Sequence, residues 1–294
     1  MFNPTEILID DFVGKLQGYY QQTFGRFKPD QGEITNWAAR MALENIANGD
    51  ALYHDVEHTM LVTMVGIHML RGKQMSEGGV SSETWMHAVL SLLCHDIGYV
   101  KGVCLSDRPD LHRYVTGKRD ETVELRPGAS DASLSAYHIE RGQMFVDERF
   151  GGHALIRAEI LKTNIEKTRF PIPDSEPPGA ARRPVEAGVG SVVPLPEIVR
   201  AADLIGQLGD PRYLQKIHAL YYEFEETGVN AKIGYRNPGD LLDGYPSFYW
   251  KSVYPYVQEG IRFLEITQDG KQVLANLYAN VFRREHARPP VGAD

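Results

Sequence analysis

The sequence predicts an all-α protein, and three observations support this fold class. Apolar residues recur three and four positions apart along most of the chain, which is the spacing of one face of an α-helix. Segments of alternating apolar and polar residues joined by Asn-Gly or Asp-Gly turns, typical of β-hairpins, are missing. Glycine and proline, which interrupt helices, are concentrated between the periodic segments.

Eight helices follow from this periodicity. They are predicted over residues 32–48, 53–71, 83–97, 133–149, 152–167, 197–208, 211–227 and 246–285. Residues 102–130 and the Gly- and Pro-rich residues 170–196 are expected to be loop insertions, the second of them either a lid or a solvated loop. The polar tail 287–294 is expected to fray. Since no loop separates halves that would each close a core, we expect one domain, residues 1–294, with its core at about 30–285.

The helix predicted over 53–71 carries histidines on its apolar face. One stripe at spacings of three and four contains His54, His58, Leu61, Val62, Val65 and Met69. Such a stripe faces the interior of a globular protein, so His54 and His58 are expected to point into the core.

Two later helices place carboxylates in apolar surroundings. The apolar run 88–94 ends in His95 and Asp96, just before Gly98, and Asp203 is embedded in the apolar helix 198–206. An unpaired carboxylate in such a place costs several kcal/mol or becomes protonated, so a bound cation is the simplest explanation. Together with His58, these residues offer two nitrogen and two oxygen ligands and leave positions open for water, which favours a catalytic metal site.

The remaining helices carry weaker signals. His138 lies in the helix 133–149, and His153 begins the helix 152–167. The aromatic run 245–256 opens the longest predicted helix and either fills the core or stacks on a base.

Composition excludes several classes of partner. With 43% hydrophobic and 24% charged residues in 294, the chain is typical of a globular protein, and its formal net charge of -8 opposes bulk nucleic-acid binding. It contains no apolar run long enough to span a membrane, and its acidic start is unlike a signal peptide, so we expect a cytoplasmic protein without a membrane partner. Cys94 and Cys104 are expected to be reduced thiols, which leaves nitrogen and oxygen as metal ligands.

The order of the histidine and aspartate segments resembles the HD superfamily of metal-dependent phosphohydrolases, and within it the catalytic core of cyclic nucleotide phosphodiesterases. The shared pattern is Tyr-His-x-x-x-His at 53–58, His-Asp at 95–96 and Ala-Asp-Leu at 202–204. Residues 160–167 are similar to the Leu-Ala-Thr-Asp-Met-x-Lys segment of that family, and residues 133–145 to its Ser-x-Leu-Glu-Asn-His-His helix. The matching stretches run from about Tyr53 to Gly206.

This resemblance implies roles for individual residues. It assigns a first metal ion, zinc, iron or manganese, to His58, His95, Asp96 and Asp203. Asp96 would bridge to a second ion, magnesium or manganese, and His54 would be the general acid. Second-metal or phosphate contacts are expected from His138, His153, Thr163 and Asn164. Substrate contacts are expected from Arg182, Arg183 and Gln258.

The chain departs from the phosphodiesterase pattern on the side of the second metal. Tyr99 replaces the last histidine of His-Asp-x-x-His, Ala136 replaces the Glu before the Asn-His pair, and Asn164 replaces the Asp after Thr163. In the family these positions serve the second metal and its water network.

We therefore expect a divalent-metal phosphohydrolase that splits a phosphodiester bond in a small cyclic nucleotide and that could form a homo-oligomer. The ions would activate a bridging water for in-line attack on phosphorus, while His54 protonates the leaving alkoxide. Three alternatives stay open. A nucleotide or sugar-phosphate monoesterase would need Arg182 and Arg183, a di-iron oxygenase like myo-inositol oxygenase would need His138 and His153, and a degenerate domain would only sense a nucleotide.

Overall fold

The computed structural model describes residues 2–176, 183–184 and 191–287. Over these residues the protein is mainly helical, which confirms the all-α prediction. Its strands there form two short antiparallel pairs, which are β1 (Arg113–Val115) with β2 (Thr122–Glu124) and β3 (Arg183–Pro184) with β4 (Ser191–Val192). The first pair lies in the predicted loop 102–130. No helix of this part of the chain is both long and apolar enough to cross a membrane.

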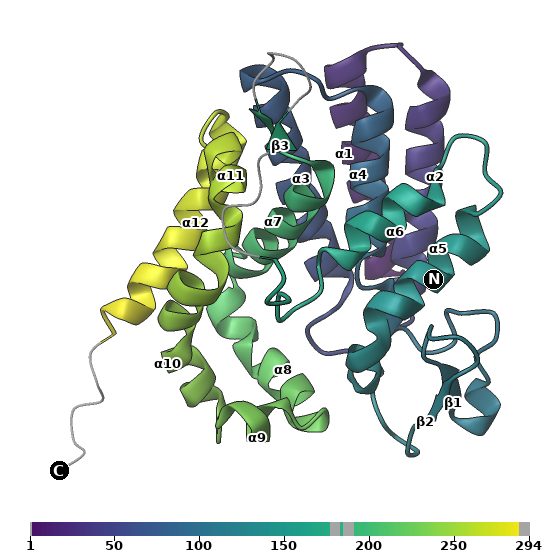
Figure 1. The fold of residues 1–294 in the computed structure, drawn as a ribbon, viewed down its shortest axis with the longest axis vertical. Coiled ribbons are helices and arrows are strands. Elements are labelled where there is room, and N and C mark those ends of the chain that lie inside the picture. The colour runs from purple at the N-terminus through teal and green to yellow at the C-terminus, as the bar shows by residue number, and fades with distance from the viewer. Residues whose placement is uncertain (1, 177–182, 185–190, 288–294) are drawn as a thin grey trace.

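Four long helices form the amino-terminal part of the bundle (Figure 1). They are α1 (Pro4–Phe24), α2 (Pro29–Ile46), α3 (Val56–Ser76) and α4 (Ser82–Cys94). The sequence analysis did not predict α1. Its buried residues, Ile9, Phe12, Leu16 and Tyr20, nevertheless follow the helical spacing, and the Asn3 side chain caps its first turn.

An irregular region follows α4 and leads into the next helices. It contains the 3-10 turns η1 (Ile97–Tyr99), η2 (Pro109–Leu111) and η3 (Asp131–Tyr137), after which come α5 (His138–Phe150) and α6 (Ala158–Glu166). The helix predicted over 133–149 is therefore a 3-10 turn joined to an α-helix. The helix predicted over 152–167 begins only at Ala158.

The carboxyl-terminal part contains six α-helices and one π-helical turn (Figure 1). They are α7 (Leu195–Leu208), α8 (Tyr213–Glu226), α9 (Val229–Ile233), α10 (Pro238–Phe248), which continues through the π-helical turn η4 (Tyr249–Val253) into α11 (Tyr254–Leu264), and α12 (Gln268–Glu285). The single helix predicted over 246–285 is therefore interrupted. Helix α11 ends at Leu264. Thr267 is the N-cap that starts α12, because its hydroxyl accepts the N–H of Gly270.

Helices α3 and α7 pack at close range in the centre of the bundle, and α3 also contacts α4 and α11. A Cβ atom on Gly206 of α7 would lie 2.7 Å from Cα of Val62, and one on Gly66 of α3 would lie 2.2 Å from Leu92 of α4. Glycine at both positions therefore lets the three helices approach one another. This packing brings the start of α3, the end of α4 and the middle of α7 to one place.

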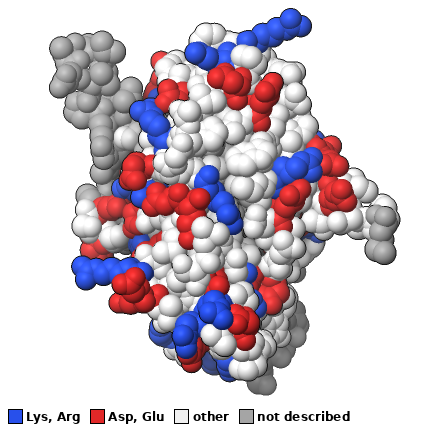
Figure 2. Space-filling model, turned by 90° about the vertical axis from the view of Figure 1, so that its right-hand side faces the viewer, with Lys and Arg blue, Asp and Glu red and all other residues white. Residues whose placement is uncertain are grey.

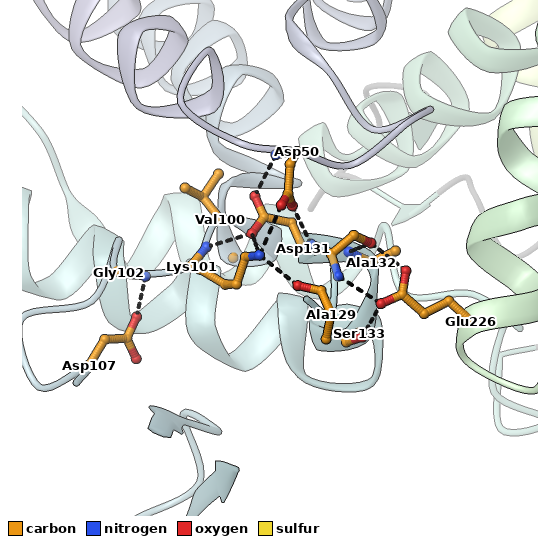
Figure 3. Close-up of polar contacts among 12 residues, drawn as sticks. Asp50, Val100, Lys101, Gly102, Asp107, Ala129, Asp131, Ala132, Ser133 and Glu226 are labelled. Atoms are coloured by element: carbon orange, nitrogen blue, oxygen red, sulfur yellow. Dashed lines mark hydrogen bonds and ion pairs between the residues drawn. The ribbon is translucent and has the colours of Figure 1, made fainter. Parts of the chain in front are cut away.

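A polar network holds the irregular region that follows α4, beside the point where α3, α4 and α7 meet (Figure 3). The carboxylate of Asp131 accepts the backbone N–H groups of Asp50 and Lys101, both at 3.1 Å. The ammonium group of Lys101 lies 3.0 Å from the Asp50 carboxylate. Glu226 of α8 accepts the Ser133 hydroxyl at 2.6 Å, so the network also ties α8 to η3.

The buried guanidinium of Arg141 holds the same region against α5. It pairs with both carboxylate oxygens of Asp107 at 3.0 Å. It also donates to the backbone carbonyl oxygens of Gly98, Val100 and Val115 at 2.6–2.9 Å. One side chain thus anchors two backbone segments, 98–100 and the end of β1, and satisfies a buried carboxylate.

Acidic and basic side chains are interspersed on the face shown in Figure 2. Lys and Arg form no continuous basic surface on that face, which agrees with the net charge of -8.

Candidate metal centre

Four expected ligands come from the ends or middle of three packed helices. His58 lies in the first turn of α3, where Asp55 caps the helix by accepting the His58 N–H at 2.9 Å. His95 and Asp96 directly follow α4, and Asp203 lies within α7.

The structure brings these four side chains together. The potential ligand atoms of His58, His95 and Asp96 all lie within 4.8 Å of one another. Oδ2 of Asp96 is 3.0 Å from Nε2 of His95 and 3.2 Å from Nε2 of His58. Oδ1 of Asp203 lies 3.4 Å from Nε2 of His95 and 3.9 Å from Nε2 of His58. One ion could therefore contact nitrogen and carboxylate ligands at once.

Two buried atoms of this group lack hydrogen bonds. Among the described residues, Nε2 of His95 and Oδ2 of Asp96 have no hydrogen-bond partner. Nδ1 of His95 donates to the Leu92 carbonyl at 2.6 Å, which directs Nε2 toward the group. Unpaired buried polar atoms are costly, so these residues fit a bound cation.

The histidines and carboxylates of this group shift one another's pKa values. Burial alone would lower the pKa of His95, but Asp96 and Asp203 raise it well above its usual value. Conversely, burial would raise the pKa of Asp96, whereas His95 and His58 hold it well below its usual range. The environment therefore favours ionised carboxylates, which are the form that binds a metal, whereas His95 would have to release its proton on binding one.

His54 lies beside the group but not on the predicted helix, because α3 begins only at Val56. Its ring centroid is 5.5 Å from that of His58. Nδ1 of His54 lies 2.6 Å from the carboxylate of Glu223 in α8. The other carboxylate oxygen of Glu223 accepts the backbone N–H of Tyr53 at 2.7 Å, so the residue also fixes the chain before α3.

This contact sets the charge of His54. Burial would lower the pKa of the imidazole, but Glu223 outweighs that effect and raises the pKa to about 9. Burial would likewise raise the pKa of Glu223, whereas His54 lowers it. At neutral pH the pair is thus an imidazolium and a carboxylate, and His54 carries a proton.

The sequence analysis did not identify Glu223. A local signal was present, since Glu223 follows Ile217 and Leu220 on the buried face of α8. It is the same signal that identified Asp203, a carboxylate within an apolar helical segment.

The ring of Tyr99 stacks between two imidazoles. Its ring lies 4.4 Å from that of His54 and 4.6 Å from that of His138, centroid to centroid. Nε2 of His138 is 3.9 Å from Oδ1 of Asp96. Burial lowers the pKa of His138 and so favours the neutral, ligand-competent imidazole.

The other expected second-metal residues have structural contacts instead. Nδ1 of His153 accepts the backbone N–H groups of residues 155 and 156 before α6. The exposed Thr163 hydroxyl donates to the Glu159 carbonyl at 2.8 Å, which is a bond within its own helix. The buried amide of Asn164 donates to the Ser91 hydroxyl at 2.8 Å and joins α6 to α4. The local resemblance did not fix which way these side chains point.

Of the three expected substrate residues, the structure describes the side chain of Gln258. Gln258 is exposed on α11 and does not line the cavity described below. Arg182 lies outside the described residues, and of Arg183 only the backbone in β3 is described.

A cavity of about 690 Å³ opens beside the metal group. Its polar end contains His54, Asp96, Tyr99, His138, Asp203 and Glu223. The rest is formed largely by apolar side chains of α7, α8, α9 and α10 and by residues 170–172. Its volume lies in the range of small-molecule sites.

The sequence model of the family described as Npun_R2479-like matches residues 2–287, which include the whole site. No curated protein and no solved structure matches the chain.

Proposed function

Because the chain belongs to the Npun_R2479-like family, whose description names no reaction, we propose a function from the site itself. The protein is a divalent-metal-dependent phosphohydrolase of the HD type that splits a phosphate ester. The observation that carries this proposal is the buried group of His58, His95 and Asp96, with Asp203 beside it, at the end of a cavity.

The ligand atoms suit zinc, iron or manganese, and they leave coordination positions open. A divalent ion held there would lower the pKa of a coordinated water and neutralise charge on the phosphoryl oxygens. Of the residues expected at a second ion, His138 lies near Asp96, with Nε2 3.9 Å from Oδ1, whereas Thr163 and Asn164 bond elsewhere, so the proposal requires one ion.

His54 supplies the proton in this proposal. The oxygen of water bonds to phosphorus, the bond from phosphorus to the alcohol oxygen breaks, and His54 gives its proton to the departing alkoxide. The proton that the water loses restores the charged state of His54 by way of solvent. Glu223 keeps His54 charged and oriented through its 2.6 Å contact.

The charge balance of the cavity favours a phosphodiester over a phosphomonoester. Three carboxylates, Asp96, Asp203 and Glu223, line the described cavity, whereas Lys251 is its only lysine or arginine. A bound divalent ion would balance Asp96 and Asp203, and His54 balances Glu223. A diester monoanion therefore requires less additional positive charge than a monoester dianion.

The test is hydrolysis of bis(p-nitrophenyl) phosphate by protein loaded with manganese or zinc. We expect metal-dependent release of p-nitrophenolate that His95→Ala abolishes and that His68→Ala, a change on α3 outside the metal group, preserves. Absence of turnover of this diester and of p-nitrophenyl phosphate with manganese, zinc, iron and magnesium would refute the proposal.

A further inference from the structure

The cavity beyond the metal group differs from a nucleotide site in its chemistry. Its far walls carry Leu220 and Phe224 of α8, Ile233 of α9 and Leu241 of α10. These helices lie next to one another below α7 in Figure 1. Lys251 is the one lysine or arginine among the described lining residues, so the far part has little to balance additional phosphates. An apolar wall of this kind gains free energy from a ligand by removing hydrocarbon from water.

Gln258, one of the expected substrate residues, is exposed on α11 and does not line this cavity. Tyr245 and Phe248 of α10 do line the cavity, and aromatic rings accept aliphatic and aromatic groups alike. The cavity thus has extensive apolar contact area, and its uncharged polar lining includes the Gln207 amide and hydroxyl groups such as those of Thr168 and Ser252.

We infer that the substrate is a phosphate ester with a single phosphate and a largely apolar alcohol group, which occupies the cavity between α8, α9 and α10. This inference rests on the proposed function, since it takes the phosphate to lie at the metal group. The apolar group would lie along Leu220, Phe224 and Leu241, and nucleoside polyphosphates would be excluded by charge.

Calorimetric titration with n-butylphosphonate and n-octylphosphonate tests this inference, because water does not split their carbon–phosphorus bond. Each added methylene should tighten binding about fourfold, which corresponds to about 0.8 kcal/mol per buried CH₂. The octyl probe should therefore bind on the order of a hundredfold more tightly than the butyl probe. The ratio of the octyl to the butyl affinity should be the same in metal-free and zinc-loaded protein. Cyclic AMP should bind more weakly than the octyl probe.

Two variants test whether the apolar lining of the cavity causes the chain-length effect. Ile233→Gln changes a half-exposed residue at the edge of the cavity, and Phe224→Gln changes a partly buried one, so both should reduce the octyl-to-butyl ratio at least several-fold. Tyr222→Gln, an exposed position on α8 outside the cavity, should preserve the ratio.

Equal affinity for both probes, tighter binding of cyclic AMP, or an equal loss in Tyr222→Gln would overturn the inference. The outcome is separable from that of the proposed function. Turnover of phosphate esters without a chain-length effect refutes the apolar substrate alone, whereas a chain-length effect without any turnover refutes the hydrolase alone.

Discussion

Removing the charge of Glu223 should disable His54 as an acid without unfolding the site. In Glu223→Gln the amide oxygen still accepts the Tyr53 N–H, but the carboxylate that raises the pKa of His54 is gone. The environment raises that pKa from 6.5 to about 9, which at about 1.4 kcal/mol per pH unit is roughly 3 kcal/mol in favour of the imidazolium. Burial lowers the pKa, and a bound ion would offset the smaller raising effect of Asp96 and Asp203, so the metal-loaded variant should have a value near 6.5 or below.

The imidazolium is the acid, so activity is lost as the pH rises through the pKa of His54. The alkaline limb of kcat/KM for an alkyl phosphodiester should therefore move from near pH 9 to near pH 6.5 in Glu223→Gln. At pH 7.5 the protonated fraction, and with it the rate, should fall about tenfold. Glu226→Gln is the matched control, because Glu226 lies one turn later on α8 and bonds Ser130 and Ser133 rather than His54. An alkaline limb that stays in place in Glu223→Gln would refute the assignment of His54.

Three further results are expected. His54→Ala should reduce kcat/KM on the order of 10²-fold or more for an alkyl phosphodiester but much less for a p-nitrophenyl ester, whose leaving group needs little protonation. Equal reductions for both esters would mean that His54 positions the substrate instead. Arg141→Met leaves the buried Asp107 carboxylate without its cation, so urea titration should show a free energy of unfolding that is lower by about 3–5 kcal/mol. A decrease below about 1 kcal/mol would contradict the anchoring role. Chelation of the metal should lower the Tm, by the equivalent of about 2.7 kcal/mol when the free metal was at a hundred times its Kd, and an unchanged Tm would argue against binding to the folded state.

The ligands that the sequence predicted share a local signal. His58, His95, Asp96 and Asp203 are polar residues embedded in apolar helical runs, and the helical period alone turns them inward. The fold class was predictable for the same reason, since burial of apolar stripes produces the periodicity that the sequence shows.

Other features depend on tertiary contacts that a local pattern does not contain. Glu223 reaches His54 across 169 positions of sequence, so no local segment reveals the pair. Thr163 and Asn164 were expected at a second metal or the phosphate, yet the packing of α6 turns one side chain outward and the other toward Ser91. Helix boundaries depended on single caps, such as Asp55 before α3 and Thr267 before α12.

The central claim is that a divalent ion binds to the group of His58, His95, Asp96 and Asp203. Elemental analysis of protein purified without added metal, and after reconstitution and desalting, tests it most directly. We expect at least one divalent ion per chain, with the content lost in His95→Ala and Asp203→Ala and retained in His68→Ala. Wild-type protein that retains no ion after reconstitution, or an Asp203→Ala variant with its full metal content, would contradict this four-residue site.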